Sequence, residues 1–284
     1  MSSADFRSPA GERNLGVGVR RMDLGLQDRV AVVTGGTSGI GLATARLLLR
    51  EGAAVAICGR DEARLAAAKA SLLGNAAEKQ LLALACDVLN KHAVDRFAGA
   101  VEQWAGRCDI LVTNAGQARM STFADTSDEA WREELELKFF SQIHPIRAFK
   151  PLLDRSDAAA ILAVNSLLAY EPEPHMVATA AARAGAQSLV KSLAREFAPR
   201  IRVNSVMLGL VDSGQWERRF VARKDQAQTR EQWLADVARD KHIPMERLGE
   251  PDEAARVIAF LCSPAAGFIT GAQLEISGGT SRHI

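Results

Sequence analysis

A glycine-rich segment near residue 35 has the residue types that bind a phosphate group. Residues 30–33 are apolar and mostly β-branched, residues 35–41 are rich in glycine, and a helical pattern follows. Such a turn exposes backbone N–H groups beside the positive end of a helix, so a nucleotide pyrophosphate can approach closely. The glycines Gly35, Gly39 and Gly41 are spaced GxxxGxG, not the commoner GxGxxG. The alternative interpretation is an ordinary tight connection between a strand and a helix.

Strand and helix patterns alternate along the chain from residue 29 onward. The predicted strands are residues 30–34, 53–58, 80–86, 110–113, 160–165, 201–206 and 273–276. The predicted helices are residues 39–51, 61–73, 91–105, 127–150, a run from about 175 to 197, and 252–262. Asp61 and Asp252 are the expected N-terminal caps of two of them. This alternation predicts a single-domain α/β fold of the Rossmann type, a doubly wound parallel sheet of seven strands with helices on both faces.

The bulk composition excludes several classes of partner. Among 284 residues, 48% are apolar and 24% are charged, which is typical of one globular α/β domain. With 35 basic and 34 acidic residues the net charge is +1, so we expect neither nucleic acid nor a membrane surface as partner. No apolar run reaches the ~18 residues of a membrane span, and the N-terminus lacks a signal pattern. The widely spaced cysteines favour reduced thiols in a cytoplasmic protein over a disulfide framework or zinc site: Cys58, Cys86, Cys108 and Cys262.

Two segments stand apart from the repeating pattern. Residues 1–25 are rich in Ser, Gly and Arg without helix or strand periodicity, which predicts a flexible extension or, alternatively, a clip onto a neighbouring subunit. Residues 26–284 form the predicted dinucleotide-binding domain. Within it, residues 212–248 are polar and spotted with aromatic residues. This insertion is too long for an ordinary connection, so we expect a helical lid over the site.

Further short motifs follow the predicted strands. They are Asp87 and Val88 after the third strand, Asn114, Ala115 and Gly116 after the fourth, residues 204–209 with Ser213 after the sixth, and Gly278 and Gly279 after the last. With the glycine turn they resemble, in order and spacing, the motifs of the short-chain dehydrogenase/reductase family over about residues 26–279. Two positions depart from that pattern, because Leu208 replaces a proline and Ser213 a threonine. The cofactor contacts that the resemblance and the residues together indicate are Gly35, Thr37, Ser38, Gly39, Ile40, Gly41, Arg60, Asp87, Val88, Asn114, Ala115, Gly116, Arg183, Gly209, Val211 and Ser213.

The end of the second predicted strand indicates which dinucleotide is bound. A carboxylate there would hydrogen-bond the adenosine ribose of NAD and repel a 2′-phosphate. This chain has Arg60 at that point and no carboxylate before Asp61. A guanidinium can bind a phosphate in bidentate fashion, and Thr37 and Ser38 supply further donors. The sequence therefore predicts NADP rather than NAD, the alternative being that Arg60 is a surface arginine at the start of a helix.

The reaction residues of the family are largely substituted. The family uses an Asn, a Ser, a Tyr and a Lys, and Ser166 stands where the serine belongs. Thr179 occupies the tyrosine position, thirteen residues further on, and Arg183 occupies the lysine position. Lys138 corresponds to the asparagine. The pattern resembles an atypical branch of the family, similar overall to 3-oxoacyl-[acyl-carrier-protein] reductases, in which Thr and Arg replace the catalytic Tyr and Lys.

These substitutions change the expected proton chemistry. An aliphatic hydroxyl is far less acidic than a tyrosine near pKa ~10, so Thr179 could orient a carbonyl but is a poor proton donor. Arg183 can hold the ribose and stabilise developing charge, but it cannot relay a proton as lysine does. The proton would come from a water, from His175 or from Lys138. The only tyrosine, Tyr170, precedes a proline-rich segment unsuited to a helix interior and is expected to pack at the end of the fifth strand.

Three acidic residues on the helix before Lys138 are interpreted as its solvated face: Glu133, Glu134 and Glu136. No cluster of metal-ligating residues is present, so no metal is expected.

The primary hypothesis is an NADP-dependent oxidoreductase that moves a hydride between nicotinamide and a carbonyl or alcohol substrate. The alternative hypothesis is a non-catalytic NADP(H)-binding sensor or partner subunit. By resemblance, the helices at 127–150 and 175–197 would form the faces of a homodimer or homotetramer.

Overall fold

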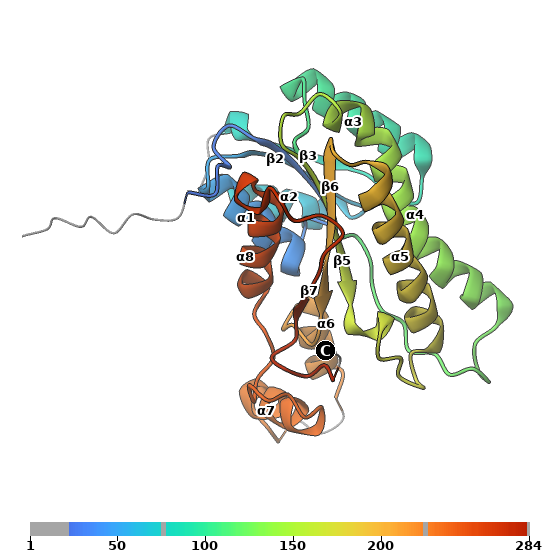
Figure 1. The fold of residues 1–284 in the computed structure, drawn as a ribbon. Helices are drawn as coiled ribbons and strands as arrows, with labels where there is room; N and C mark the ends of the chain where they lie inside the picture. Colours follow the sequence, from blue (N-terminus) through green and yellow to red (C-terminus); the bar gives the residue numbers. More distant parts are fainter. Residues whose placement is uncertain (1–22, 75–77, 224–226, 283–284) are drawn as a thin grey trace, which may run out of the picture.

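The computed structural model describes residues 23–74, 78–223 and 227–282, which fold around one parallel sheet (Figure 1). In the described chain the spatial order is β3-β2-β1-β4-β5-β6-β7, and every neighbouring pair is parallel. The predicted doubly wound fold of seven strands is confirmed. The strands are β1 (Val30–Thr34), β2 (Ala54–Gly59), β3 (Leu81–Ala85), β4 (Ile110–Thr113), β5 (Ala159–Ser166), β6 (Ile201–Leu208) and β7 (Gln273–Ile276).

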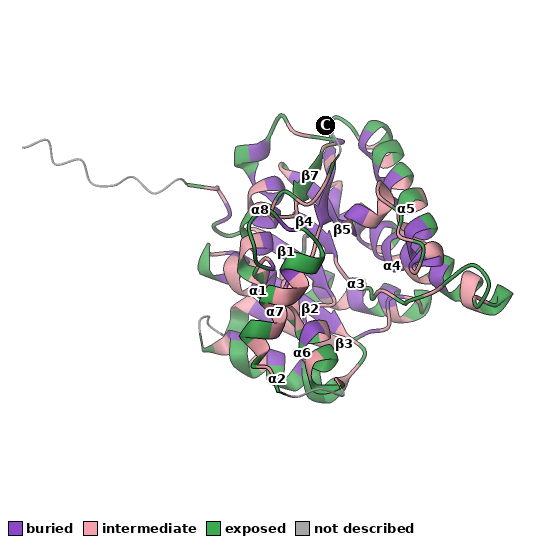
Figure 2. Cartoon of the chain, turned by 90° about the horizontal axis from the view of Figure 1, so that it is seen from below, coloured by how far each residue is buried: buried purple, intermediate pink, exposed green. Residues whose placement is uncertain are grey.

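Helices cover both faces of the sheet. They are α1 (Gly39–Arg50), α2 (Glu62–Leu73), α3 (Lys91–Ala105), α4 (Asp128–Leu153), α5 (Val177–Glu196), α6 (Gly214–Val221), α7 (Arg230–Asp240) and α8 (Pro251–Cys262). One apolar core joins α1, α2 and α8 to the sheet, and a second joins α3, α4 and α5 to its other face. The strands are buried on both sides: Ala31 and Val33 belong to the first core, Val30 and Val32 to the second. Figure 2 shows this buried sheet between helices whose outer surfaces are exposed.

The strand order places the site. From β1 the chain runs outward to β2 and β3, then returns to the other side of β1 with β4. The loops after β1 and β4 therefore leave the sheet in opposite directions and open a crevice at the carboxyl edge. The glycine turn follows β1, so it lies in that crevice.

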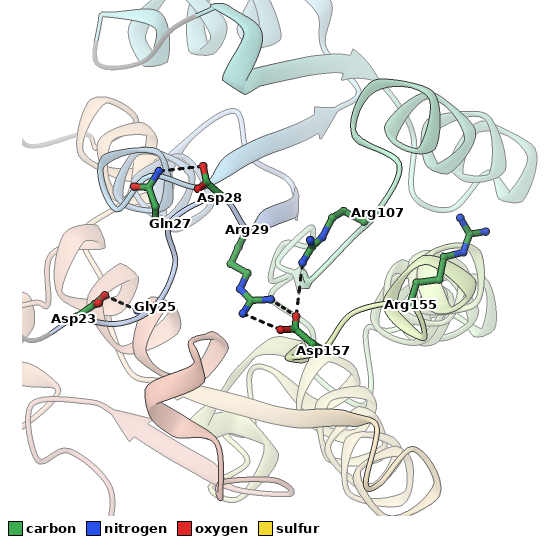
Figure 3. Close-up of a pocket in the computed structure, with 8 residues that line it drawn as sticks. All are labelled: Asp23, Gly25, Gln27, Asp28, Arg29, Arg107, Arg155 and Asp157. Atoms are coloured by element: carbon green, nitrogen blue, oxygen red, sulfur yellow. Dashed lines mark hydrogen bonds and ion pairs between the residues drawn. The ribbon is translucent and has the colours of Figure 1, made fainter.

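The opposite, amino-terminal edge of the sheet is closed by ion pairs (Figure 3). Arg29 pairs with Asp157, and Arg107 donates to buried Asp109 at 2.5 Å. Asp109 also accepts the Val30 N–H at 2.8 Å, which ties the charged cluster to the first residue of β1. Arg29, Arg107 and Asp157 line a shallow hollow of about 560 Å³ but pair with acidic or basic partners, so this edge stabilises the sheet.

Several boundaries differ from the sequence prediction. Helix α4 was expected to stop before Pro151, yet it continues to Leu153 because its last turn packs Leu152 and Leu153 into the core. The cap of α8 is Glu250, not the predicted Asp252, with Pro251 as the first helical residue. Asp252 lies in the first turn, where a negative charge favours the helix dipole. Asp61 caps α2 as expected, accepting the Arg64 N–H at 2.9 Å.

The insertion at 212–248 contains α6 and α7, and residues 224–226 within it lie outside the described chain. It has an apolar cluster of its own, built on Trp216, Ala238, Ile243 and Leu248. Of the predicted N-terminal extension, 1–22 also lie outside the described residues, and Leu26 is already buried in the core. In the described chain no helix combines the length and apolarity that a bilayer crossing requires.

Candidate functional site

A cavity of about 920 Å³ lies at the carboxyl edge of the sheet, between the loops after β1 and β4. It extends from the end of β2 to α6. Fifteen of the sixteen expected cofactor contacts line it, the exception being Gly41. These residues, which the sequence spreads over positions 35–213, are brought together around one cavity: Gly35, Thr37, Ser38, Gly39, Ile40, Arg60, Asp87, Val88, Asn114, Ala115, Gly116, Arg183, Gly209, Val211 and Ser213.

The glycine turn presents bare backbone to this cavity. Gly35 and Gly39 have φ of +65° and +52°, a region that side chains disfavour. Gly41 lies behind the turn, where a Cβ would come within 2.3 Å of the Gly35 carbonyl oxygen. Gly41 therefore lets α1 begin directly against the turn. The first turn of α1, with its free N–H groups, faces the cavity.

Asn114 holds the glycine turn in place. Its side-chain amide donates to the carbonyl oxygens of Thr34 and Gly35, both at 3.1 Å. The Thr34 hydroxyl in turn accepts the backbone N–H groups of Asn114 and Ala115 at 3.0 and 3.1 Å. These bonds join the carboxyl ends of β1 and β4 where the crevice opens.

Arg60 lies at the end of the cavity beside β2 and the glycine turn. A Cβ on the preceding Gly59 would meet Thr37 Cγ2 at 2.6 Å, so the end of β2 packs against the turn itself. Ser38 caps α1 by backbone alone, which leaves its hydroxyl for a ligand. The carboxylate of Asp61 is engaged with the N-terminus of α2 and with Arg64 at 3.1 Å. The three donors Arg60, Thr37 and Ser38 thus share one end of the cavity.

The expected reaction residues divide into two groups. Ser166, Lys138 and Arg183 line the cavity. Thr179 is fully buried and is not part of the cavity wall. Its hydroxyl lies 2.9 Å from Glu134 Oε2 and 3.2 Å from the Arg119 carbonyl oxygen. At the position of the family's tyrosine, the structure thus has a hydroxyl that faces α4 instead of the cavity.

Glu134 corrects the sequence interpretation. It was assigned to a solvated face with Glu133 and Glu136, but its side chain is only 4% exposed. Its Oε2 lies 2.9 Å from Lys138 Nζ, one helical turn further along α4. Lys138 Nζ also donates to the Gln117 carbonyl oxygen at 2.7 Å. A buried ion pair therefore borders the cavity.

The charges around Lys138 act in opposite directions. Burial, followed by the charge of Arg183, lowers the pKa of Lys138 from its ordinary value, and the Glu134 carboxylate raises it again. The net shift in pKa is downward. The Lys138 ammonium therefore releases its proton more readily than a surface lysine does.

Arg183 is held from behind. Its guanidinium donates to Asn165 Oδ1 at 3.1 Å, and the Asn165 amide donates to the Arg183 carbonyl oxygen at 3.1 Å. Burial lowers the pKa of Arg183 to about 10. Its buried Nε has no partner among the described residues, which leaves one N–H for a ligand in the cavity.

Two other proton donors were considered from the sequence. Tyr170 does not line the cavity, and burial, with the charge of Glu275, raises its pKa, opposite to what proton donation near neutral pH requires. His175 does line the cavity, and its Nε2 lies 3.0 Å from Glu173 Oε2. Its side chain is 45% exposed, so His175 is more open to water than Lys138.

The spacing of the residues on α4 indicates a buried position for Glu134. The buried positions of α4 include Lys138, Gln142, Pro145 and Phe149, at steps of three and four residues. Extending this stripe by one more step toward the N-terminus reaches Glu134. A charged pair on an otherwise buried stripe indicates a functional pair more than a solvated face.

Known proteins share this architecture. A family model described as Enoyl-(Acyl carrier protein) reductase matches residues 35–281. Dehydrogenase/reductase SDR family member 4 of Homo sapiens is 30% identical over 257 residues, which cover 90% of this chain and 88% of that protein. This chain belongs to the short-chain dehydrogenase/reductase family. The oxidoreductase fold expected from the motifs is thereby confirmed.

Two solved structures are similar over nearly their whole length. The NADPH-bound form of a short-chain oxidoreductase from Pseudomonas aeruginosa, described as containing an atypical catalytic center, is 58% identical with a TM-score of 0.86, covering 91% of this chain and 100% of that one. L-Sorbose reductase from Gluconobacter frateurii, complexed with NADPH and L-sorbose, is 32% identical with a TM-score of 0.86, covering 93% and 100%. A 3-oxoacyl-[acyl-carrier-protein] reductase of Vibrio cholerae is 32% identical over 90% of this chain and 98% of that protein.

Proposed function

We propose that this chain is an NADPH-dependent reductase of a small carbonyl substrate, with Lys138 as the proton donor in place of the family's tyrosine. One observation carries the proposal. The Lys138 ammonium group, buried in an ion pair, borders the same cavity as the glycine turn and Ser166. A proton donor and a turn suited to a phosphate group therefore border one cavity.

The residues present fit a phosphorylated dinucleotide. The turn leaves no room for side chains, and the helix α1 behind it begins with unpaired N–H groups, which suit a pyrophosphate. Arg60, Thr37 and Ser38 suit the 2′-phosphate that distinguishes NADP from NAD. Arg183 Nε, buried with no partner in the described part of the chain, suits a ribose hydroxyl. The NADPH-bound relatives support the same choice.

When bound, the reduced nucleotide supplies a hydride to the carbonyl carbon. Residues of the chain itself stabilise and protonate the substrate oxygen. Ser166, Lys138 and Arg183 all border the cavity, and the two cations would stabilise negative charge as it develops on the substrate oxygen. Lys138 then gives a proton to that oxygen, and water entering through the cavity restores the lost proton. Arg183 is assigned the electrostatic part instead, because its guanidinium is held by Asn165 Oδ1 and spreads its charge over three nitrogens.

The test is NADPH oxidation with a panel of carbonyl compounds that includes L-sorbose and 3-oxoacyl thioesters, the substrates suggested by the relatives. We expect turnover on at least one compound. Lys138→Met should reduce it ~10²- to 10⁴-fold, the usual contribution of a general acid, while NADPH affinity stays unchanged. Turnover that is indifferent to Lys138→Met refutes the assigned proton donor.

The second candidate is the sensor or partner subunit, favoured by the one observation that the Thr179 hydroxyl faces away from the cavity. Tight NADPH binding without turnover on any compound would support it. We further propose a reducing, cytoplasmic setting, supported by four buried free thiols, and a homodimer or homotetramer, supported by the family resemblance alone.

A further inference from the structure

The buried carboxylate of Glu134 is shared by two helices. A single oxygen, Oε2, lies 2.9 Å from both Lys138 Nζ on α4 and Thr179 Oγ1 on α5. All three side chains are buried, with relative exposures of 3%, 5% and 0% for Glu134, Lys138 and Thr179. Because the threonine comes from another helix, the packing of α4 against α5 fixes where the carboxylate stands.

Lys138 has three N–H bonds, and the structure accounts for two of them. One donates to Glu134, and a second donates to the Gln117 carbonyl oxygen at 2.7 Å. An ammonium group places its donors tetrahedrally, so these two bonds set the direction of the third. Because Lys138 borders the cavity, the third N–H is the one available to a ligand there.

The charged groups that face Lys138 come from three elements. Glu134 lies on its own helix, Arg183 on α5, and Arg119 on the loop before α4. His175, from the segment before α5, borders the same cavity. The two arginines and burial favour the neutral amine. Glu134 is the group that favours the ammonium form.

We propose that Glu134 is a positioning residue of the reaction centre: fixed by Thr179, it keeps Lys138 protonated and aims its third N–H into the cavity. The inference rests on the proposed function, since it assumes that Lys138 gives the proton. In that step the N–H bond of Lys138 breaks and an O–H bond forms on the substrate, while the accompanying hydride comes from the reduced nucleotide. Lys138 is left as a neutral amine, and Glu134 keeps its charge throughout.

In this proposal Thr179, which stands at the position of the family's tyrosine, has a role of its own. Its hydroxyl binds the carboxylate that controls the replacement acid. Serine would serve equally well there, whereas valine, which has the same shape without the hydroxyl, would not.

The experiment measures the protonation of Lys138 directly in the full chain. Trace acetylation with acetic anhydride labels only the neutral amine, so the labelling of Lys138, followed by mass spectrometry from about pH 6 to about pH 11, reports its titration without any substrate. The variants are Glu134→Gln, Thr179→Val and Thr179→Ser. The control is Glu136→Gln, which makes the same change at an exposed position of the same helix. Each protein is measured with and without saturating NADPH, and NADPH binding also verifies that it is folded.

We expect the labelling midpoint of Glu134→Gln to fall by at least about one pH unit, because the Lys138 ammonium loses its opposing charge. Thr179→Val should shift the midpoint in the same direction by less, and Thr179→Ser and Glu136→Gln should keep the wild-type midpoint. An unchanged midpoint in Glu134→Gln overturns the inference. If Glu134→Gln does not fold, equal midpoints for the valine and serine variants at position 179 overturn it instead.

The two proposals fail differently. If Lys138→Met retains turnover while Glu134→Gln still shifts the midpoint, the proposed proton donor is wrong and the role of Glu134 is only to hold a buried ammonium. If Lys138→Met abolishes turnover and Glu134→Gln leaves the midpoint in place, the donor stands and the positioning inference falls. A downward shift in the alkaline limb of the turnover profile of Glu134→Gln would support both.

Discussion

Replacing Lys138 by methionine should destabilise the fold far more than the loss of a surface charge does. Methionine fills the volume of the lysine stem, so packing changes little. The change leaves the Glu134 carboxylate, 4% exposed, without its ammonium partner and, among the described residues, with the Thr179 hydroxyl as its one remaining donor. Removing one member of a buried pair typically costs about 3–5 kcal/mol. We expect the free energy of unfolding of Lys138→Met to fall by that amount.

The double variant isolates the cause. Combining Lys138→Met with Glu134→Gln removes the uncompensated charge and leaves an amide that can still accept a bond from Thr179. Its free energy of unfolding should therefore return to within about 1.5 kcal/mol of wild type, since neutral replacement of a buried pair is often nearly neutral. Turnover would remain lost. Recovery of stability without recovery of activity separates the structural part of the pair from its chemistry.

The assay is urea unfolding in the absence of NADPH, monitored by circular dichroism. The slope of the unfolding transition is compared among the variants. The matched control is Lys91→Met, which breaks the pair with Asp95 on α3. That pair has the same i,i+4 arrangement, with Nζ 2.7 Å from the carboxylate, but its side chains are 61% and 44% exposed. We expect Lys91→Met to cost less than about 0.5 kcal/mol. If Lys138→Met were at least as stable as Lys91→Met, the stabilising role of the buried ion pair would be refuted.

Three further predictions concern the cofactor cavity and the core. Arg60→Ala should weaken NADPH binding ~10- to 100-fold, because a charge-assisted contact is lost, and should leave NADH affinity nearly unchanged. Calorimetric titrations with each nucleotide measure both affinities, and equal losses would exclude a phosphate contact. Gly41→Ala places a Cβ 2.3 Å from the Gly35 carbonyl oxygen. It should therefore lower the free energy of unfolding by ~1–3 kcal/mol and weaken NADPH binding. The control Gly99→Ala, with open space around its Cβ, should do neither. Burial raises the pKa of the Cys262 thiol from 9.0 to about 12, so the stability that the thiol contributes is complete below pH 9.0 and is lost as the pH rises toward 12. The difference in unfolding free energy between wild type and Cys262→Ala should shrink over that range, and a constant difference would contradict the assignment.

The fold could be predicted because its signals are local. Each strand is a short apolar run, and each phosphate-binding element lies within a few residues of a strand end. The glycine turn needs only its own seven residues and the strand before it. The cavity was therefore predictable in composition, since parallel strands bring their carboxyl ends to one edge whatever lies between them.

The reaction centre could be predicted only in part because its contacts cross between helices. Glu134 and Thr179 are 45 positions apart, and nothing local to either residue shows that they meet. Charge density on α4 suggested a solvated face, and only the packing of α5 decides otherwise. Within the insertion expected at 212–248, the bounds of α6 and α7 were likewise not predicted, because their apolar residues form a small cluster of their own and follow no simple period.

The central claim is that a hydride leaves NADPH for a carbonyl carbon while Lys138 protonates the oxygen. The most direct measurement uses NADPH deuterated at the transferring C4 position and follows deuterium in the alcohol product, for wild type and for Lys138→Met at equal nucleotide occupancy. We expect deuterium on the alcohol carbon with wild type and ~10²-fold slower or no transfer with the variant. Transfer at the wild-type rate by Lys138→Met, or none by wild type to any carbonyl compound despite bound NADPH, would contradict it.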